Sequence, residues 1–210
     1  MSITVAPVGN SRILSVGTYR PKRVVPNSEI VDRIDSTDEW IVQRTGIESR
    51  RFAGDDETVI SMAKAACEIA LKRAKLTIAD IDTVILSTIS YPFQAPSAAT
   101  ELINELGNPK AAAFDISAAC AGFCYGVAMG SDLVRSGTSK NVLVIGVEKL
   151  SDYTDPDDRA TAFIFADGAG AVIIGQSDQP RIGQTIWGSD ADSRDAITLT
   201  PSFLDFKKNP

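Results

Sequence analysis

The sequence predicts an α/β fold in which a mixed β-sheet lies between two layers of helices. Short apolar runs of strand length alternate with segments whose apolar residues recur at helical spacing, a pattern typical of strands joined by crossover helices. Two of these runs, residues 83–88 and 141–147, contain no charged residue, which indicates strands covered on both faces. Hydrophobic residues make up 44% of the 210 residues, enough for a sizeable core.

The elements are expected in the order β-α-β-α-β-α-β-β. Asn27 could cap a short helix through Ile34, and the next helix has a cap among residues 35–37 and a stop near Gly46. The main helices are expected at residues 38–44, 58–75, 97–106 and 119–136. The strands are expected at residues 13–18, 83–88, 111–116 and 141–147, followed by a return pair at 161–165 and 169–175.

After about residue 176 the pattern weakens. Residues 181–187 could form one more strand, and residues 190–210 have the composition of a loop or tail. We therefore divide the chain into a domain at residues 1–176 and the start of a connecting region at residues 177–210.

Composition and charge exclude several classes of function. The net charge is −6 and no run of lysine or arginine is present, so no nucleic-acid partner is expected. No apolar run reaches the ~20 residues that a membrane-spanning helix needs. Three cysteines without a secretory leader favour a reducing, cytoplasmic setting. The chain has no histidine, so a mechanism that needs an imidazole must take it from elsewhere.

The most informative stretch is residues 114–130, FDISAACAGFCYGVAMG. It places Cys120 among small residues, where a strand ends and a helix begins. The partial positive charge of a helix N-terminus favours thiolate over thiol, and small neighbours leave room for an acyl group. An inert cysteine in a well-packed helix is the alternative, since free cysteine is among the most buried residue types. Cys67, on the apolar face of its helix, is expected in the core.

Two other chemistries are considered and rejected. Gly168 and Gly170 suggest a dinucleotide loop, but Ile173 stands at the third glycine position and the segment lies between strands. Cys120 and Cys124 lie one helical turn apart, yet no histidine or second cysteine pair is present to complete a metal site. We expect neither a metal nor a cofactor.

Four stretches in this order resemble one family, the β-ketoacyl-acyl-carrier-protein synthases III, which are the initiating condensing enzymes of type II fatty acid synthesis in the thiolase superfamily. They are residues 17–27 (GTYRPKRVVPN), 35–47 (DSTDEWIVQRTGI), 115–126 (DISAACAGFCYG) and 155–171 (DPDDRATAFIFADGAGA). The resemblance implies a thiolase-like fold, of which this chain would form one three-layer α/β/α half of a five-layer, two-half structure.

The resemblance also implies roles for individual residues. Cys120 matches the nucleophile that accepts the acyl group from acyl-CoA as a thioester. Trp40 and Arg159 match the pair that stacks on the CoA adenine, a role that suits a planar indole and a guanidinium. Further polar contacts to the CoA nucleotide are implied for Ser36, Arg44 and Thr45.

The acyl pocket shows a departure from part of the family. In members that use acetyl primers, a phenylalanine before the matching proline closes the pocket from the partner subunit of a homodimer. Here that position is Ala95, preceded by Gln94. The resemblance therefore implies a homodimer with a longer pocket, and we expect medium or long acyl-CoA primers.

The family also needs a histidine and an asparagine to decarboxylate malonyl-acyl-carrier-protein, and the pattern places both beyond Pro210. We therefore expect that condensation requires a C-terminal half that these residues do not supply. Two alternatives stay open: a related acyltransferase of secondary metabolism, or a non-catalytic half-subunit that binds CoA.

Overall fold

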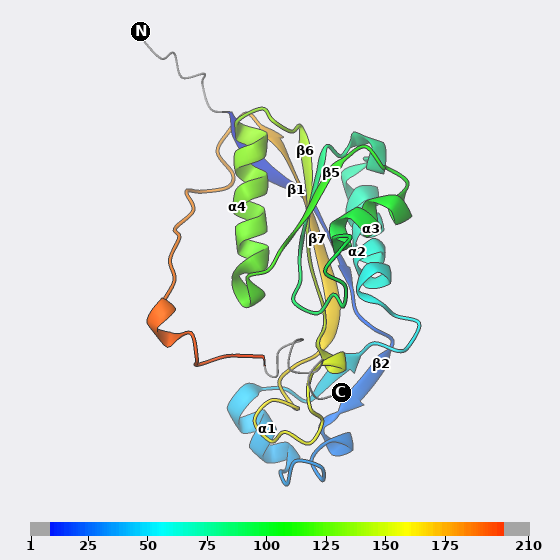
Figure 1. Ribbon diagram of the computed structural model, residues 1–210, viewed down its shortest axis with the longest axis vertical. Helices are drawn as coiled ribbons and strands as arrows, with labels where there is room; N and C mark the ends of the chain where they lie inside the picture. Colours follow the sequence, from blue (N-terminus) through cyan, green and yellow to red (C-terminus); the bar gives the residue numbers. More distant parts are fainter. Residues whose placement is uncertain (1–8, 200–210) are drawn as a thin grey trace.

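The computed structural model describes residues 9–199, and its centre is a five-stranded mixed sheet (Figure 1). The strand order is β1-β7-β6-β4-β5, with β4 parallel to β5 and β6, and β7 antiparallel to β6 and β1. The strands are β1 (Asn10–Tyr19), β4 (Thr83–Ser87), β5 (Ala112–Ile116), β6 (Asn141–Lys149) and β7 (Asp167–Ser177).

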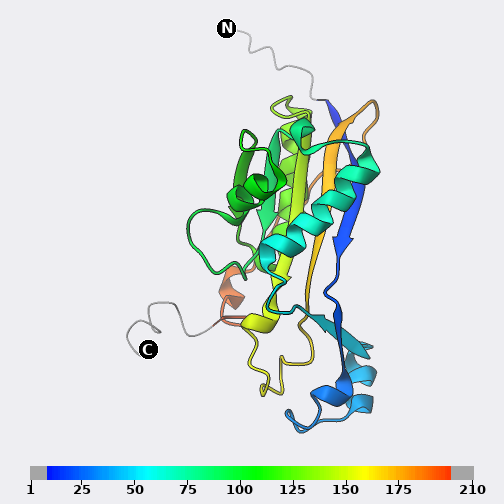
Figure 2. The same ribbon diagram turned by 90° about the vertical axis from the view of Figure 1, so that its right-hand side faces the viewer.

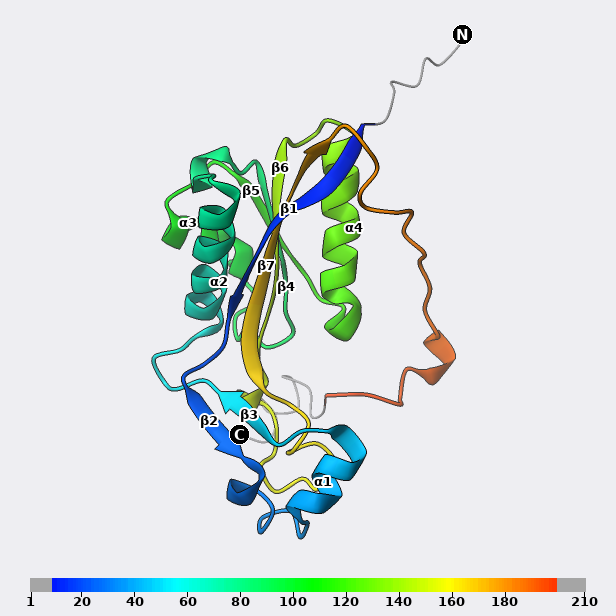
Figure 3. The same ribbon diagram turned by 180° about the vertical axis from the view of Figure 1, so that it is seen from behind.

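Helices cover both faces of this sheet, which confirms the predicted three-layer α/β/α arrangement. Two helices, α2 (Val59–Ala74) and α3 (Ala98–Leu106), pack on one face, and α2 crosses the strands obliquely (Figure 2). On the opposite face lies α4 (Gly122–Arg135), as the view from behind also shows (Figure 3). A separate apolar core fills each interface, so β4 and β6 are buried on both sides.

Side-chain caps and a left-handed glycine mark the ends of the helices α2 and α3. Thr58 accepts a hydrogen bond from the amide of Ser61 at the start of α2, and Ser97 accepts one from the amide of Thr100 at the start of α3. Gly107 ends α3 with φ 85°, a left-handed conformation that glycine adopts without steric cost. None of the helices in the described part of the chain is long and apolar enough to cross a membrane.

A small lobe, which we define as residues 23–52, lies below the lower end of the large sheet (Figure 1). Its apolar core takes in Ala162 and Phe163 from the segment that precedes β7. The lobe consists of β2 (Arg23–Pro26), the 3-10 turn η1 (Asn27–Glu29), α1 (Asp38–Thr45) and β3 (Ser49–Phe52).

Three expectations about elements are wrong. Residues 161–165 form turns and not a strand, because Phe163 is buried in the small lobe and Asp158 accepts hydrogen bonds from the amide of Ala160 and the hydroxyl of Thr161. The expected helix after Asn27 is only the turn η1, since the Asn27 side chain bonds to other segments and does not cap it.

Residues 181–187 form no strand. Beyond β7 the described chain contains only one regular element, the 3-10 turn η5 (Ala191–Ser193). Along this stretch Ile182 packs against the core between α4 and the sheet, and the ring of Trp187 lies 4.9 Å from that of Tyr125 on α4. The expected tail at 190–210 extends beyond the described residues from position 200 onward.

Candidate active site

Cys120 lies at the carboxyl end of β5, on a tight turn that leads into α4. The predicted helix at 119–136 begins as the 3-10 turn η3 (Ala119–Ala121), and α4 starts only at Gly122. Ala119 has φ 43°, in the left-handed region that costs energy for any residue with a Cβ. The turn leaves Cys120 exposed, not buried, in the described chain. Its place beyond the carboxyl ends of parallel strands is typical of ligand sites in α/β sheets.

The other two thiols differ from each other. Cys124, one turn further along α4, is also exposed. Cys67 is fully buried on the apolar face of α2, as predicted, and this burial raises the pKa of its thiol.

The start of α4 packs directly against the sheet, because glycines on this helix leave no side chain between its backbone and the strands. A Cβ added at Gly122 would lie 1.9 Å from the Oγ of Ser87 on β4, and one added at Gly126 would lie 2.8 Å from a methyl group of Val144 on β6. Glycine is therefore required for this close approach. The position of Cys120 follows from direct contact between the helix backbone and the strands.

A shallow depression of about 400 Å³ adjoins the turn that carries Cys120. Its lining is largely apolar, with one charged side chain from β6 and one from β7. The residues around it include Ser87, Ala119, Phe123, Glu148, Asp167 and Gly168.

The residues expected to bind the CoA nucleotide come together at the small lobe. The guanidinium carbon of Arg44 lies 4.2 Å from the centre of the Trp40 ring, and that of Arg159 lies 5.7 Å from it. Phe163 supports the indole edge-on, with ring centres 5.4 Å apart. Arg159 is tethered to the loop before α1, because its Nη1 donates to the carbonyls of Ile34 and Asp35.

The two hydroxyl groups predicted to contact the nucleotide, those of Ser36 and Thr45, differ in burial and in hydrogen bonding. The Oγ of Ser36 is buried and has no hydrogen-bond partner among residues 9–199. The hydroxyl of Thr45 is exposed but engaged at the end of α1, donating to the carbonyl of Ile41 at 2.7 Å and accepting from the amide of Ile47 at 3.0 Å.

Gln94 and Ala95 are both exposed, on the segment that leaves the carboxyl end of β4. They therefore share one end of the sheet with Cys120 but do not cover it within this single chain. Phe93, next to them, has 63% of its surface exposed.

Buried polar residues that sequence reasoning missed hold the small lobe in shape. Arg50 is 5% exposed and donates to the carbonyls of Val25 and Phe163, both at 3.2 Å, and to Oδ1 of Asn27 at 2.6 Å. Burial lowers the pKa of its guanidinium. Asn27 in turn donates to Asp38 at 2.6 Å. In the sequence, this buried network is marked only by the adjacent arginines at 50–51, a pattern typical of a solvent-exposed segment.

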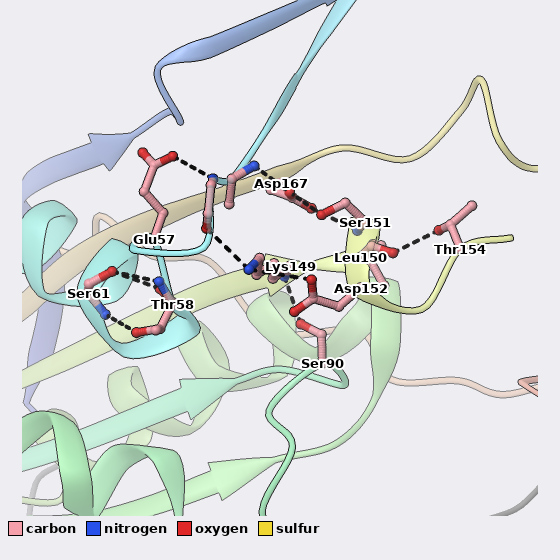
Figure 4. A network of polar contacts seen from close by, with 12 residues as sticks. Glu57, Thr58, Ser61, Ser90, Lys149, Leu150, Ser151, Asp152, Thr154 and Asp167 are labelled. Carbon is pink, nitrogen blue, oxygen red and sulfur yellow. Dashed lines mark hydrogen bonds and ion pairs between the residues drawn. The ribbon is translucent and has the colours of Figure 1, made fainter. Parts of the chain in front are cut away.

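A second buried group, Asp167, joins the segment that follows the small lobe to the sheet (Figure 4). Its carboxylate accepts from the amide of Ala53 at 2.7 Å and from the amide and hydroxyl of Ser151 at 2.9 and 2.6 Å. Nearby, Lys149 donates to the carbonyl of Gly54 at 3.3 Å. These bonds hold residues 53–54, which follow β3, against β6 and β7. Across residues 9–199, no three His, Cys, Asp or Glu side chains are grouped so as to hold a metal ion.

Comparison with known proteins finds similar sequences in one family. The family profile for 3-oxoacyl-[acyl-carrier-protein] synthase III matches residues 114–191, the part that contains Cys120. The β-ketoacyl-[acyl-carrier-protein] synthase III of Streptomyces glaucescens is 52% identical over 94% of this chain and 60% of its own length. That of Kocuria rhizophila is 51% identical over 96% of this chain and 57% of its own.

Solved structures agree with the sequence comparison. The priming β-ketosynthase of the R1128 polyketide pathway matches all of this chain and 63% of its own, with a TM-score of 0.95 and 42% identity. The 3-oxoacyl-[acyl-carrier-protein] synthase III of Aquifex aeolicus matches 81% of this chain and 55% of its own, with a TM-score of 0.79 and 42% identity. The chain spans about 60% of the length of the curated relatives it matches. In sequence and in its thiolase-like fold, the chain matches about 60% of the length of β-ketoacyl-acyl-carrier-protein synthases III.

Proposed function

We propose that the chain provides the acyl-accepting and CoA-binding part of an initiating condensing enzyme. The reaction joins acyl-CoA and malonyl-acyl-carrier-protein to give 3-oxoacyl-acyl-carrier-protein, CoA and CO2. The observation that carries this proposal is the exposed Cys120 on a strained turn, at the start of α4 and at the carboxyl end of the parallel strands. No metal or cofactor is part of the reaction as proposed.

The chemistry has two steps. The Cys120 thiolate attacks the thioester carbonyl of acyl-CoA, a new C–S bond forms, and the bond to the CoA sulfur breaks so that CoA leaves as a thiolate. Malonyl-acyl-carrier-protein then loses CO2, and the resulting carbanion attacks the Cys120 thioester and expels the cysteine thiolate. Because the 210 residues contain no histidine, we propose that the groups assisting decarboxylation come from a C-terminal half. The isolated chain would then carry out only the first step.

The cluster at the small lobe is the proposed site for the CoA nucleotide. Trp40 offers an aromatic face, and the cationic Arg159 and Arg44 near it suit an adenine and phosphates. A planar ring between two groups needs about 7 Å, twice a contact of ~3.5 Å. Since Arg159 lies 5.7 Å from the Trp40 ring centre, we propose that it moves outward when the adenine enters. Ser36 and Thr45 complete the proposed polar contacts.

The pocket for the acyl chain is proposed to include Gln94 and Ala95 and to accept medium or long primers. A homodimer is part of this proposal. Its support is β5, which lies at the edge of the sheet and pairs only with β4 within residues 9–199. An edge strand presents backbone donors and acceptors to which a second copy can add.

The remaining parts of the proposal concern the whole protein. Residues 1–176 would form the first thiolase-like half, and 177–210 would begin the connection to the C-terminal half. That half would cover the outer face of α4, where Cys124 and Met129 are exposed. A cytoplasmic location is supported by the three cysteines, which are all free thiols.

Mass spectrometry of the protein after mixing with acyl-CoA tests the proposal. The expected product is one acyl group on Cys120, which is lost in Cys120→Ser and kept in the matched control Cys124→Ser. A series from acetyl-CoA to long acyl-CoA tests primer length. No adduct with any thioester would favour a non-catalytic CoA-binding subunit, and a clear optimum at acetyl-CoA would contradict the longer pocket.

A second candidate function is the priming of a polyketide in secondary metabolism. One observation favours it: the similarity to the R1128 priming β-ketosynthase extends over the full chain with a TM-score of 0.95. Both functions load Cys120 in the same way, so only the second substrate separates them. Comparing extension on a fatty-acid carrier protein with extension on a polyketide carrier protein would decide.

A further inference from the structure

The segment that carries Gln94 and Ala95 is held at its two ends by carboxylates from two different strands. Residues 88–97 leave the carboxyl end of β4 and lead into α3. In the sheet, β4 lies between β6 and β5. Glu148 on β6 binds the start of the segment, and Asp115 on β5 binds the first turn of α3 just beyond its end.

At the start, one carboxylate collects three donors. Glu148 accepts from the amide of Ile89 at 3.0 and 3.2 Å through its two oxygens, from the hydroxyl of Thr88 at 3.2 Å, and from the hydroxyl of Ser90. Thr88 and Ser90 are 7% and 2% exposed. The Ser90 oxygen also accepts from the amide of Lys149 at 2.8 Å, which adds a second link between the segment and β6.

The environment of Glu148 shows that these bonds are its main interactions. Burial raises the pKa of its carboxyl group, although the hydrogen bonds from Ser90, Ile89 and Thr88 act in the opposite direction. A carboxylate withdrawn from water is costly unless donors satisfy it. Within residues 9–199, all hydrogen bonds that the Glu148 carboxylate accepts come from residues 88–90, so its interactions are concentrated on one segment.

At the other end the geometry is equally specific. The two oxygens of Asp115 accept from the amides of Ala98 and Ala99 at 2.7 and 2.8 Å. Ser97 caps the same helix through the amide of Thr100 at 3.1 Å. The end of the segment is therefore fixed to β5, the strand that leads to Cys120.

The middle of the segment has few contacts of its own. Residues 92–96 are all exposed. Next to them, Tyr91 donates its hydroxyl to Glu101, and its ring lies 5.6 Å from that of Phe93. The course of residues 92–96 is therefore determined largely from the two ends.

We propose that Glu148 is a positioning residue that fixes the start of segment 88–97 and thereby influences which acyl chain lengths the pocket accepts. The selectivity part of this inference rests on the proposed acyl pocket at Gln94 and Ala95. In this role Glu148 acts through Thr88, Ile89 and Ser90.

Glu148→Gln is the test variant, because it keeps the shape of the side chain and replaces one acceptor oxygen by a donor. Asp167→Asn is the matched control. Asp167 is also a buried carboxylate that accepts three hydrogen bonds, but its donors are Ala53 and Ser151, neither of which belongs to segment 88–97. Asp115 is unsuitable as the test position, since its loss would also disturb the strand that leads to Cys120.

Two readouts on the full chain are combined. Hydrogen exchange of peptides from 88–97 should become faster by about fivefold in Glu148→Gln, the effect of losing roughly one hydrogen bond, and stay unchanged in Asp167→Asn. The ratio of Cys120 acylation rates with octanoyl-CoA and acetyl-CoA should change by a similar factor of about five in Glu148→Gln alone. General destabilisation would lower both rates together and leave their ratio unchanged.

The outcomes separate the parts of the inference. Unchanged exchange of segment 88–97 in Glu148→Gln would overturn the positioning role. Faster exchange with an unchanged ratio would overturn the link to chain length. A wild-type protein that neither thioester acylates would refute the proposed function and the selectivity claim, whereas faster exchange in the variant would still support the positioning role. If Glu148→Gln does not fold, Ser90→Ala removes the hydrogen bonds of the Ser90 hydroxyl to Glu148 and to the amide of Lys149, and it decides by the same two readouts.

Discussion

The contact between α4 and the sheet leads to a sharp prediction for Gly122→Ala. The added Cβ would lie 1.9 Å from the Oγ and 3.2 Å from the Cβ of Ser87. Both distances are below a normal carbon contact of about 3.5 Å, so either Ser87 rotates or the start of α4 moves away from β4. Because Cys120 lies two residues before Gly122, the second response would also displace the thiol.

The size of the effect can be worked from these contacts. Overpacking by one methyl group costs about 1–3 kcal/mol, and alanine regains up to ~1 kcal/mol of helix propensity over glycine. We expect the free energy of unfolding to fall by about 1–2 kcal/mol. In the double variant with Ser87→Ala, the 1.9 Å contact with Oγ is removed and only the 3.2 Å contact with the Cβ of residue 87 remains. We therefore expect a coupling free energy of about 1 kcal/mol between the two substitutions, so that the double variant regains most of the stability lost in Gly122→Ala.

Urea unfolding of the four proteins of this double-mutant cycle gives the coupling, and the rate of Cys120 acylation reports the displacement. Gly170→Ala is the control, because a Cβ there meets nothing within 4 Å, and its stability should stay within about 0.5 kcal/mol of the wild type. A Gly122→Ala protein as stable and as active as the wild type, or one that Ser87→Ala fails to improve, would refute the close approach of α4 to β4.

Three further predictions use the buried and capped groups. Iodoacetamide should alkylate Cys120 in the native protein and spare Cys67, which is fully buried with a raised pKa; peptide mapping that finds native Cys67 modified would contradict this. Burial and the hydrogen bond to Glu101 raise the pKa of Tyr91 to about 12. The contribution of Tyr91 to the free energy of unfolding is therefore fully present below its ordinary pKa of 10.0 and is lost as the pH rises toward 12. Tyr91→Phe should remove the most alkaline phase of an absorbance titration, and an unchanged phase would refute the assignment. Asp115→Asn should lower the free energy of unfolding by about 1 kcal/mol through the start of α3, and an unchanged urea midpoint would count against that cap.

The large sheet was predictable because its strands are coded locally. In β4 and β6 the apolar runs are continuous, and both strands are buried on two faces as such runs require. The hairpin of β2 and β3 could not be found in the same way. Each strand has four residues and pairs with a partner more than twenty positions away, so only tertiary contact specifies it.

The strand predicted at 161–165 does not form, for a similar reason. The letters TAFIF read as a strand, but Phe163 is buried beside Trp40 while Ile164 is 47% exposed. What decides the conformation is Asp158, whose carboxylate organises the turn around Ala160 and Thr161. Such a competition between a side-chain acceptor and the strand ladder cannot be read from apolar pattern alone.

The site was predictable to different degrees. Cys120 stands out because its small neighbours and the strand-to-helix junction are contiguous in sequence. Trp40 and Arg159 lie close together only through the fold, and the resemblance alone had paired them. Glu148 gave no signal, since a glutamate followed by lysine at the end of an apolar run looks like the return of the chain to solvent.

Segment 88–97 has a consequence for how such an enzyme can diversify. Because the segment is fastened at its ends and exposed at residues 92–96, exchanges in that middle stretch should have little effect on folding. Primer preference could then drift, or be engineered, without compensating mutations elsewhere. Glu148 and Asp115 would be intolerant of change in the same libraries. Deep mutational scanning should therefore show that substitutions are tolerated at residues 92–96 but not at these two acidic positions, which are distant in sequence.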